Sequence, residues 1–183
     1  MKLKEINKLV YRANLNKVII SFVITLALLS LVFGQILIYF FADVSTTISG
    51  TTDNTTAEAP SNFRYNLLGV ILALLACAAI LHQLREKLFF TEIYYVWQLK
   101  QVHNLIYRRL VKIKAAAAKN DVNAIVILNY YYKSLKQVYL LDDNTLTMSK
   151  LEKDIKELDE IIMRDNLSIS TEQFDKTLIA AYK

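Results

Sequence analysis

The sequence predicts an all-α protein with two membrane-spanning helices and a small helical bundle. Residues 18–42 and 65–84 contain no Asp, Glu, Lys or Arg. At ~1.5 Å rise per residue, each stretch is long enough as a helix to cross a hydrocarbon core of about 30 Å. The chain has only three glycines and one proline in 183 residues, which favours long helices over a turn-rich β fold.

The predicted order is a basic tail at 1–17, a first span at 18–42, a polar loop at 43–64, a second span at 65–84 and a helical bundle at 85–183. The tail carries five basic residues and one acid, the loop one basic residue and three acids, and residues 85–119 eight basic residues and two acids. The positive-inside rule therefore predicts a hairpin with both termini in the cytoplasm. The first span is far longer than the ~7–15 apolar residues of a signal peptide, so it is predicted to be an uncleaved anchor.

Small residues predict how the two spans pack in the membrane. They recur along one face of each span: Ser30 and Gly34 on the first, and Gly69, Ala73 and Cys77 on the second. Such residues let helix backbones approach closely, either within one hairpin or between two copies of the chain. Gln35, the amide within the first span, is interpreted as an interhelical hydrogen-bonding group, with a pore-lining role as the alternative.

Aromatic residues gather where the chain leaves the second span, and we predict that they lie at the membrane interface: Phe89, Phe90, Tyr94, Tyr95 and Trp97. Thr91 could cap a new helix there, or the span could run on without a break. A helical stripe continues to Ile113. The basic residues near its end are candidates for contact with anionic lipid, or for simple solvation: Arg108, Arg109, Lys112 and Lys114.

Further helices are predicted beyond residue 120. Asn120 or Asp121 could cap the first of them, in which apolar residues from Ile125 to Tyr139 repeat as a heptad seam. Tyr130, Tyr131 and Tyr132 must fan out around this helix, so at least one ring should lie outside the seam. We interpret them as interhelical packing or as a partner surface.

The last helices are marked by capping patterns. Asp142 to Asn144 should end the preceding helix, Ser149-x-x-Glu152 is read as a capping box that opens the next, and Asp165-Asn166 should end that one. Ser170-x-x-Gln173 is read as a capping box that opens a short final helix. Each helix has one apolar stripe, so together they predict a small antiparallel bundle.

The sequence contains no recognisable catalytic, metal or cofactor motif. His82 and His103 fall in different elements, and the one cysteine, Cys77, does not complete a zinc-ligand pattern with them; His103 is expected on the surface. No phosphate-binding glycine loop is present. Residues 1–119 carry a net charge of +8 and residues 120–183 a net charge of −3, so a basic soluble face suited to nucleic acid is not predicted. We predict no enzyme activity, no cofactor and no small-molecule substrate.

Three stretches carry a resemblance to a known family: SNFRYNLLGV at 61–70, FFTEIYYVWQLKQVHNLIYRRLVKI at 89–113 and ILNYYYKSLKQVYLLDDNTLT at 127–147. With the N-terminal KLKEINKLVYRANLNKVIIS, the chain resembles, over essentially its whole length, the uncharacterised bacterial family known as domain of unknown function 3087. The resemblance implies a two-span protein of a Gram-negative inner membrane. It implies no activity and no catalytic residue.

The leading hypothesis is therefore a non-enzymatic, multi-pass inner-membrane protein. Its cytoplasmic bundle would bind another protein or a second copy of the chain, and its spans would contact membrane lipids. Two alternatives stay open at this point: a subunit of a small oligomeric channel or transporter, with Gln35 in the pore, and a lipid-sensing module that uses the four basic residues at 108–114.

Overall fold

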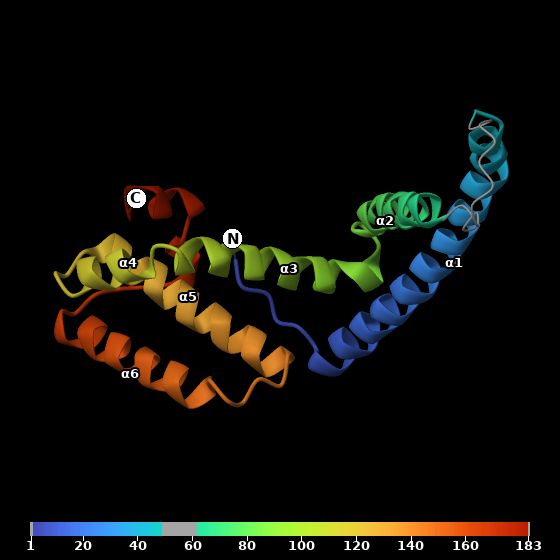
Figure 1. Cartoon of the computed structure of the whole chain (residues 1–183). Coiled ribbons are helices and arrows are strands. Elements are labelled where there is room, and N and C mark those ends of the chain that lie inside the picture. Colours follow the sequence, from blue (N-terminus) through green and yellow to red (C-terminus); the bar gives the residue numbers. More distant parts are fainter. Residues whose placement is uncertain (1, 49–61, 183) are drawn as a thin grey trace. The chain divides into compact units, whose positions relative to one another are not determined.

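The computed structural model describes residues 2–48 and 62–182, with side chains omitted at 42–48. The helices are α1 (Lys8–Ile48), α2 (Phe63–Leu84), α3 (Leu88–Tyr107), α4 (Leu110–Ala117), α5 (Val122–Leu141) and α6 (Met148–Arg164), followed by 3-10 helices at Thr171–Gln173 and Lys176–Tyr182 (Figure 1). The described residues form no strand, so the predicted all-α class is confirmed.

The chain forms two compact units. One contains Asn14–Phe90, and therefore most of α1 and all of α2. The other contains Thr91–Lys183 together with Met1–Ala13, so the N-terminal residues belong to the helical bundle. The sequence predicts these residues to be a separate basic tail. Local patterns cannot show that they join the bundle, because their contacts lie more than 90 residues away along the chain.

α1 and α2 are the two helices long and apolar enough to cross a membrane. α1 starts ten residues before the predicted first span and continues to Ile48, beyond its predicted end. Most of the predicted polar loop, residues 49–61, lies outside the described residues. α2 begins at Phe63, two residues before the predicted second span, and ends with it at Leu84.

The helix after the second span is a separate one. α2 stops at Leu84, Arg85–Lys87 form a turn, and α3 begins at Leu88, so Thr91 lies inside the helix and does not cap it. A second break at Arg108 and Arg109 divides the predicted long helix into α3 and α4. Arg109 leaves the helical region, with φ −119° and ψ 6°, and becomes the N-cap of α4.

α5 is the central helix of the bundle and contacts α4, α6 and both 3-10 helices (Figure 1). Its N-cap is Asp121, whose carboxylate accepts hydrogen bonds from the backbone N–H groups of Asn123 at 2.9 Å and Ala124 at 3.4 Å. Every residue from Ala124 to Tyr132 is buried. The heptad seam was therefore too narrow a prediction for this part of α5, which neighbours cover on all sides, whereas Lys133 and Leu140 further along the helix are exposed.

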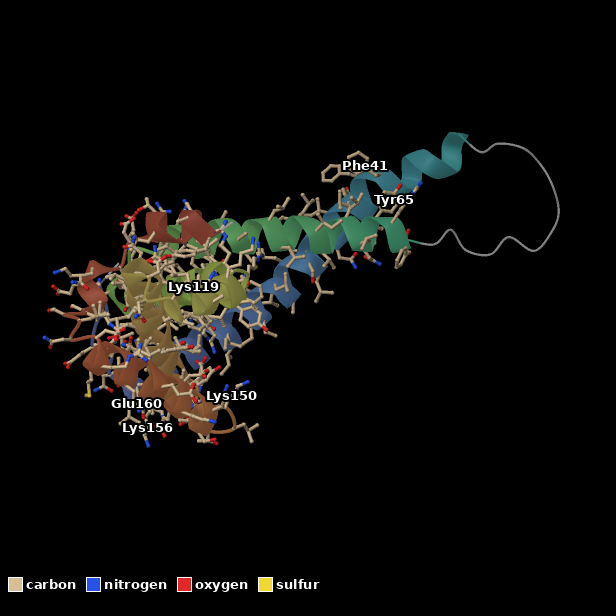
Figure 2. The ribbon with its side chains drawn as sticks, turned by 90° about the vertical axis from the view of Figure 1, so that its left-hand side faces the viewer. Phe41, Tyr65, Lys119, Lys150, Lys156 and Glu160 are labelled. Atoms are coloured by element: carbon tan, nitrogen blue, oxygen red, sulfur yellow. The ribbon has the colours of Figure 1, made fainter. Side chains whose placement is uncertain are left out.

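α6 covers α5 with Leu151 and Leu158 and directs its charged side to the outside. Lys150, Lys156 and Glu160 project from that outer side (Figure 2). The predicted capping box at its start is wrong: α6 begins at Met148, and the Glu152 carboxylate accepts a hydrogen bond from the Lys136 ammonium at 2.9 Å.

Toward the C-terminus, the helix ends and the last cap agree better with the sequence predictions. α5 and α6 stop where predicted, with Asp143 and Asn166 in the left-handed region at φ 54° and 50°. The Ser170 capping box forms: Ser170 Oγ accepts from the N–H of Glu172 at 3.2 Å, and Gln173 Oε1 accepts from the N–H of Ser170 at 3.0 Å. It opens a 3-10 turn and not an α-helix.

Candidate membrane and interaction sites

Two glycines allow the backbones of α1 and α2 to approach closely. A Cβ atom on Gly69 would lie 2.6 Å from the backbone nitrogen of Gly34, 2.8 Å from its Cα and 3.1 Å from the carbonyl oxygen of Ser30. Ala73 and Cys77 continue the same face of α2 and are buried. The structure thus brings the predicted small residues together within one hairpin, where absent side chains allow backbone contact.

Polar groups accompany this contact toward the far end of the hairpin. The Tyr65 hydroxyl donates to the carbonyl oxygen of Phe41 at 2.9 Å, and the two residues lie next to each other in Figure 2. Gln35 is exposed on α1 and does not lie between the two helices. The interhelical hydrogen bond expected of Gln35 within one hairpin is therefore not formed.

The aromatic residues after α2 divide into two sets. Phe89 and Trp97 are exposed, and the half-buried Tyr94 stacks on Trp97 with ring centroids 5.6 Å apart. Phe90 and Tyr95 are buried, so the prediction of a common interfacial role does not apply to them. The helical period does not separate the two sets, because buried Phe90 and exposed Trp97 are seven residues apart and lie on nearly the same side of the helix.

Tyr95 is buried because the N-terminal segment covers it. Its hydroxyl accepts a hydrogen bond from the N–H of Lys4 at 3.0 Å and donates to the carbonyl oxygen of Lys2 at 3.4 Å. The Lys4 ammonium lies 5.7 Å from the centroid of the same ring. Residues of the predicted basic tail are therefore anchored on α3.

Acidic groups of the bundle hold the same segment. Asp143 pairs with both Lys8 and Arg12, and Lys2 pairs with Glu172 at 3.1 Å. The sequence signal for this contact was present in the opposite charges of the two ends of the chain. The positive-inside rule uses the same basic charges for membrane topology and does not predict their contact with the bundle.

The four basic residues near α4 do not form one free cationic surface. Arg109 donates to the carbonyl oxygen of Ile179 at 3.3 Å. Lys114 pairs with Asp154 at 3.5 Å and lies 5.6 Å from the Tyr132 ring centroid. Burial opposes the charged form of Lys114, but Tyr132 and Asp154 outweigh it and raise its pKa. Arg108, in the break between α3 and α4, and Lys112, within α4, are exposed.

The tyrosine triplet is buried inside the bundle, so it does not provide the partner surface suggested as one interpretation. Tyr130 stacks on Phe174, with ring centroids 3.9 Å apart and planes at 11°. Tyr132 packs under Lys114. Burial raises the pKa of the Tyr131 hydroxyl to about 12. The three rings can all be buried because every residue from Ala124 to Tyr132 is covered by neighbouring segments.

His103 and Ser134 form a buried pair between α3 and α5. His103 Nε2 and Ser134 Oγ are 2.7 Å apart, and the Ser134 hydroxyl donates to the carbonyl oxygen of Tyr131 at 3.0 Å. His103 is 7% exposed and Ser134 is 0% exposed, so the surface position predicted for His103 is wrong. Burial lowers the pKa of His103 to about 4, with Lys100 adding to the effect. A neutral imidazole and an enclosed hydroxyl give a structural link between two helices.

Among residues 2–48 and 62–182, no group of three or more His, Cys, Asp or Glu side chains is arranged to hold a metal ion.

These features define the class of protein: an all-helical chain with two apolar helices of membrane-spanning length and a compact helical bundle. The chain belongs to the family described as Protein of unknown function (DUF3087), whose model matches residues 1–179. No curated protein and no solved structure is significantly similar to the chain.

Proposed function

We propose that the chain is a non-enzymatic, two-span protein of a bacterial inner membrane, with both termini in the cytoplasm. The observation that carries the proposal is the exposure of apolar side chains along both helices: Leu28, Leu31 and Leu75 are each at least 60% exposed. An apolar surface of this extent is typical of contact with lipid. The basic charge at residues 1–17 and 85–119 supports the cytoplasmic placement of the termini.

Topology reporters test this placement. Alkaline phosphatase, which is active only outside the cytoplasm, and green fluorescent protein, which fluoresces only inside it, would be fused in turn after Lys183 and within residues 49–61. We expect fluorescence from the C-terminal fusion and phosphatase activity from the loop fusion. The reverse pattern, or release of the protein from membranes by carbonate, would overturn the proposal.

The bundle would act through contact with another protein or with a second copy of the chain. The face of α3 that points into the bundle includes Tyr95, Leu99 and Ile106, which are all buried. Trp97 and Gln101 lie on the opposite face at helical spacing and are exposed, with Tyr94 stacked beside Trp97. Exposed Trp and Tyr are the residue types that most often dominate protein–protein contacts. The contact surface is thus assigned to α3 and not to the tyrosine triplet on α5.

The single tryptophan makes this assignment measurable. Trp97→Ala should reduce the mass of the complex extracted from membranes or remove a stoichiometric partner. Tyr107→Ala is the matched control, because Tyr107 is a 67% exposed aromatic residue on another side of α3. In the wild-type protein, brominated lipid should not quench Trp97 fluorescence. Strong quenching, with an unchanged complex in Trp97→Ala, would place the ring in the membrane interface and contradict the proposal.

A further inference from the structure

A groove lies between α1 and α2, away from their glycine contact. Its volume is about 300 Å³, and its walls include Lys17, Ser21 and Thr25 from α1 and Cys77 and Leu81 from α2, with Phe89 at one end. Thr25 lies nine residues before Gly34, and Cys77 eight residues after Gly69, which is about 12–14 Å along each helix from the contact. Beyond the glycine contact, the side chains of the two helices leave the space that forms this groove.

The groove is too small to enclose another helix. A helix is ~10 Å across with its side chains, so a segment about 12 Å long occupies roughly 900 Å³, three times the volume that is present. A single hydrocarbon chain is narrow enough to enter. Because the walls are mostly apolar, and because a spanning helix pair is surrounded by lipid, an acyl chain is also the occupant with the lowest cost of desolvation.

One end of the groove carries a positive charge and none of its walls carries a negative one. Lys17 is the last charged residue before the uncharged run of α1, so it lies where that helix would enter the headgroup layer. Lys8 and Arg12, earlier on the same helix, are paired with Asp143. Within the described part of the chain, the Lys17 ammonium has no carboxylate within ion-pair distance, and the lining contains no Asp or Glu.

The polar groups along α1 lie at depths that match the phosphate, ester and acyl regions of a phospholipid. Ser21 lies one turn, ~6 Å, below Lys17, and Thr25 a further turn below that. The groove thus extends about 12 Å from its charged end, compared with ~15 Å for one leaflet of the hydrocarbon core. A phosphate beside Lys17 would leave the ester oxygens near the Ser21 hydroxyl and the chain against Ile80 and Leu81.

We propose that this groove binds one anionic membrane phospholipid, with its phosphate on Lys17 and one acyl chain between α1 and α2. The proposal rests on the membrane placement given above. It assigns lipid selectivity to the hairpin and to a single cation, and it does not use the basic residues near α4.

Native mass spectrometry of the full chain tests the site. The protein would be released from nanodiscs that contain equal amounts of phosphatidylglycerol and phosphatidylcholine. We expect one retained phosphatidylglycerol per chain. Lys17→Gln should reduce its retention roughly fivefold, which corresponds to the ~1 kcal/mol typical of one basic residue at a lipid surface. Lys2→Gln removes the same charge outside the groove and should leave retention unchanged.

A second variant tests the acyl-chain position independently of charge. Thr25→Phe adds bulk to the groove wall without changing charge, and it should reduce retention of phosphatidylglycerol even with Lys17 present. Equal retention of the two lipids, equal effects of Lys17→Gln and Lys2→Gln, or a lipid-free dimer would each overturn the proposal. If the protein stays in carbonate-washed membranes but retains no lipid, the groove assignment fails while the membrane placement stands. Release of the protein by carbonate would contradict both the groove assignment and the membrane placement.

Discussion

The contact between Gly69 and Gly34 gives the sharpest prediction about the membrane hairpin. In Gly69→Ala, the new Cβ would lie 2.6 Å from the Gly34 nitrogen and 2.8 Å from its Cα. Ordinary van der Waals contact begins near 3.4 Å, so the helices must separate by at least about 0.8 Å at this point. Backbone atoms cannot rotate away as a side chain can. We expect a loss of about 1–3 kcal/mol in hairpin stability, the usual cost of overpacking.

Gly34→Ala is the matched control for this prediction. Its Cβ would meet Asn66 Oδ1 at 3.0 Å, a side-chain atom that can shift, and the next atom is 3.8 Å away. The substitution should therefore cost well under half as much as Gly69→Ala. The two changes are chemically identical, so a difference between them reports the geometry of the contact alone.

The single cysteine provides the assay. Cys77 lies on the same face of α2 as Gly69 and is 2% exposed. Helix separation should expose its thiol, so a lipid-soluble maleimide should modify Gly69→Ala several times faster than the wild-type protein in nanodiscs. Thermal unfolding of the same samples would report stability. Wild-type rates in Gly69→Ala, or a larger effect in Gly34→Ala, would refute the reasoning.

The remaining predictions concern the bundle. The pKa of His103 is lowered from 6.5 to about 4 in the folded state, so the unfolded chain takes up the proton first as pH falls. Stability is complete above pH 6.5 and is lost toward pH 4; between pH 7 and 5 the loss should be about 2 kcal/mol. Denaturant unfolding should show this slope in the wild-type bundle and a weaker slope in His103→Gln. Asp143→Asn keeps a residue that tolerates the left-handed backbone but removes the charge that holds Lys8 and Arg12. Its cost should be at most ~1–2 kcal/mol for two exposed pairs, and trypsin should cleave near residue 12 faster than in the wild type; unchanged cleavage would contradict the role of these pairs. Asp121→Ala removes the N-cap of α5 and the partner of the Tyr182 hydroxyl at 2.8 Å, and should lower the free energy of unfolding by about 1–2 kcal/mol by circular dichroism. Asp121→Asn, which can still cap, should lose less.

The N-terminal segment has a consequence for any truncated form of the protein. Residues 2–12 cover Tyr95 and pair with Asp143 and Glu172, so they are part of the bundle's fold. Removing them would expose the Tyr95 ring and leave Asp143 without its two cations. A soluble version of the bundle should therefore include this segment, connected or added as a peptide.

The sequence by itself determined the helical class, the two apolar helices and most helix ends. These features depend on local properties: the length of an uncharged run, the period of apolar residues and the turn-forming residues at 142–144 and 165–166. Local reasoning also selected the small residues of the hairpin that lie together in the structure. It failed at the start of α6, where Glu152 pairs with Lys136 on α5 and does not return to its own N-terminus.

Only the tertiary structure decided which side chains are covered. Tyr95, His103 and the three tyrosines of α5 are polar or aromatic residues that suit a surface equally well, and they are buried because distant segments lie over them. For Tyr95 that segment is 91 residues away, and for Tyr130 the stacking partner Phe174 is 44 residues away. Burial of such residues is a property of contacts between segments, and periodicity within one helix carries no information about which segment will cover it.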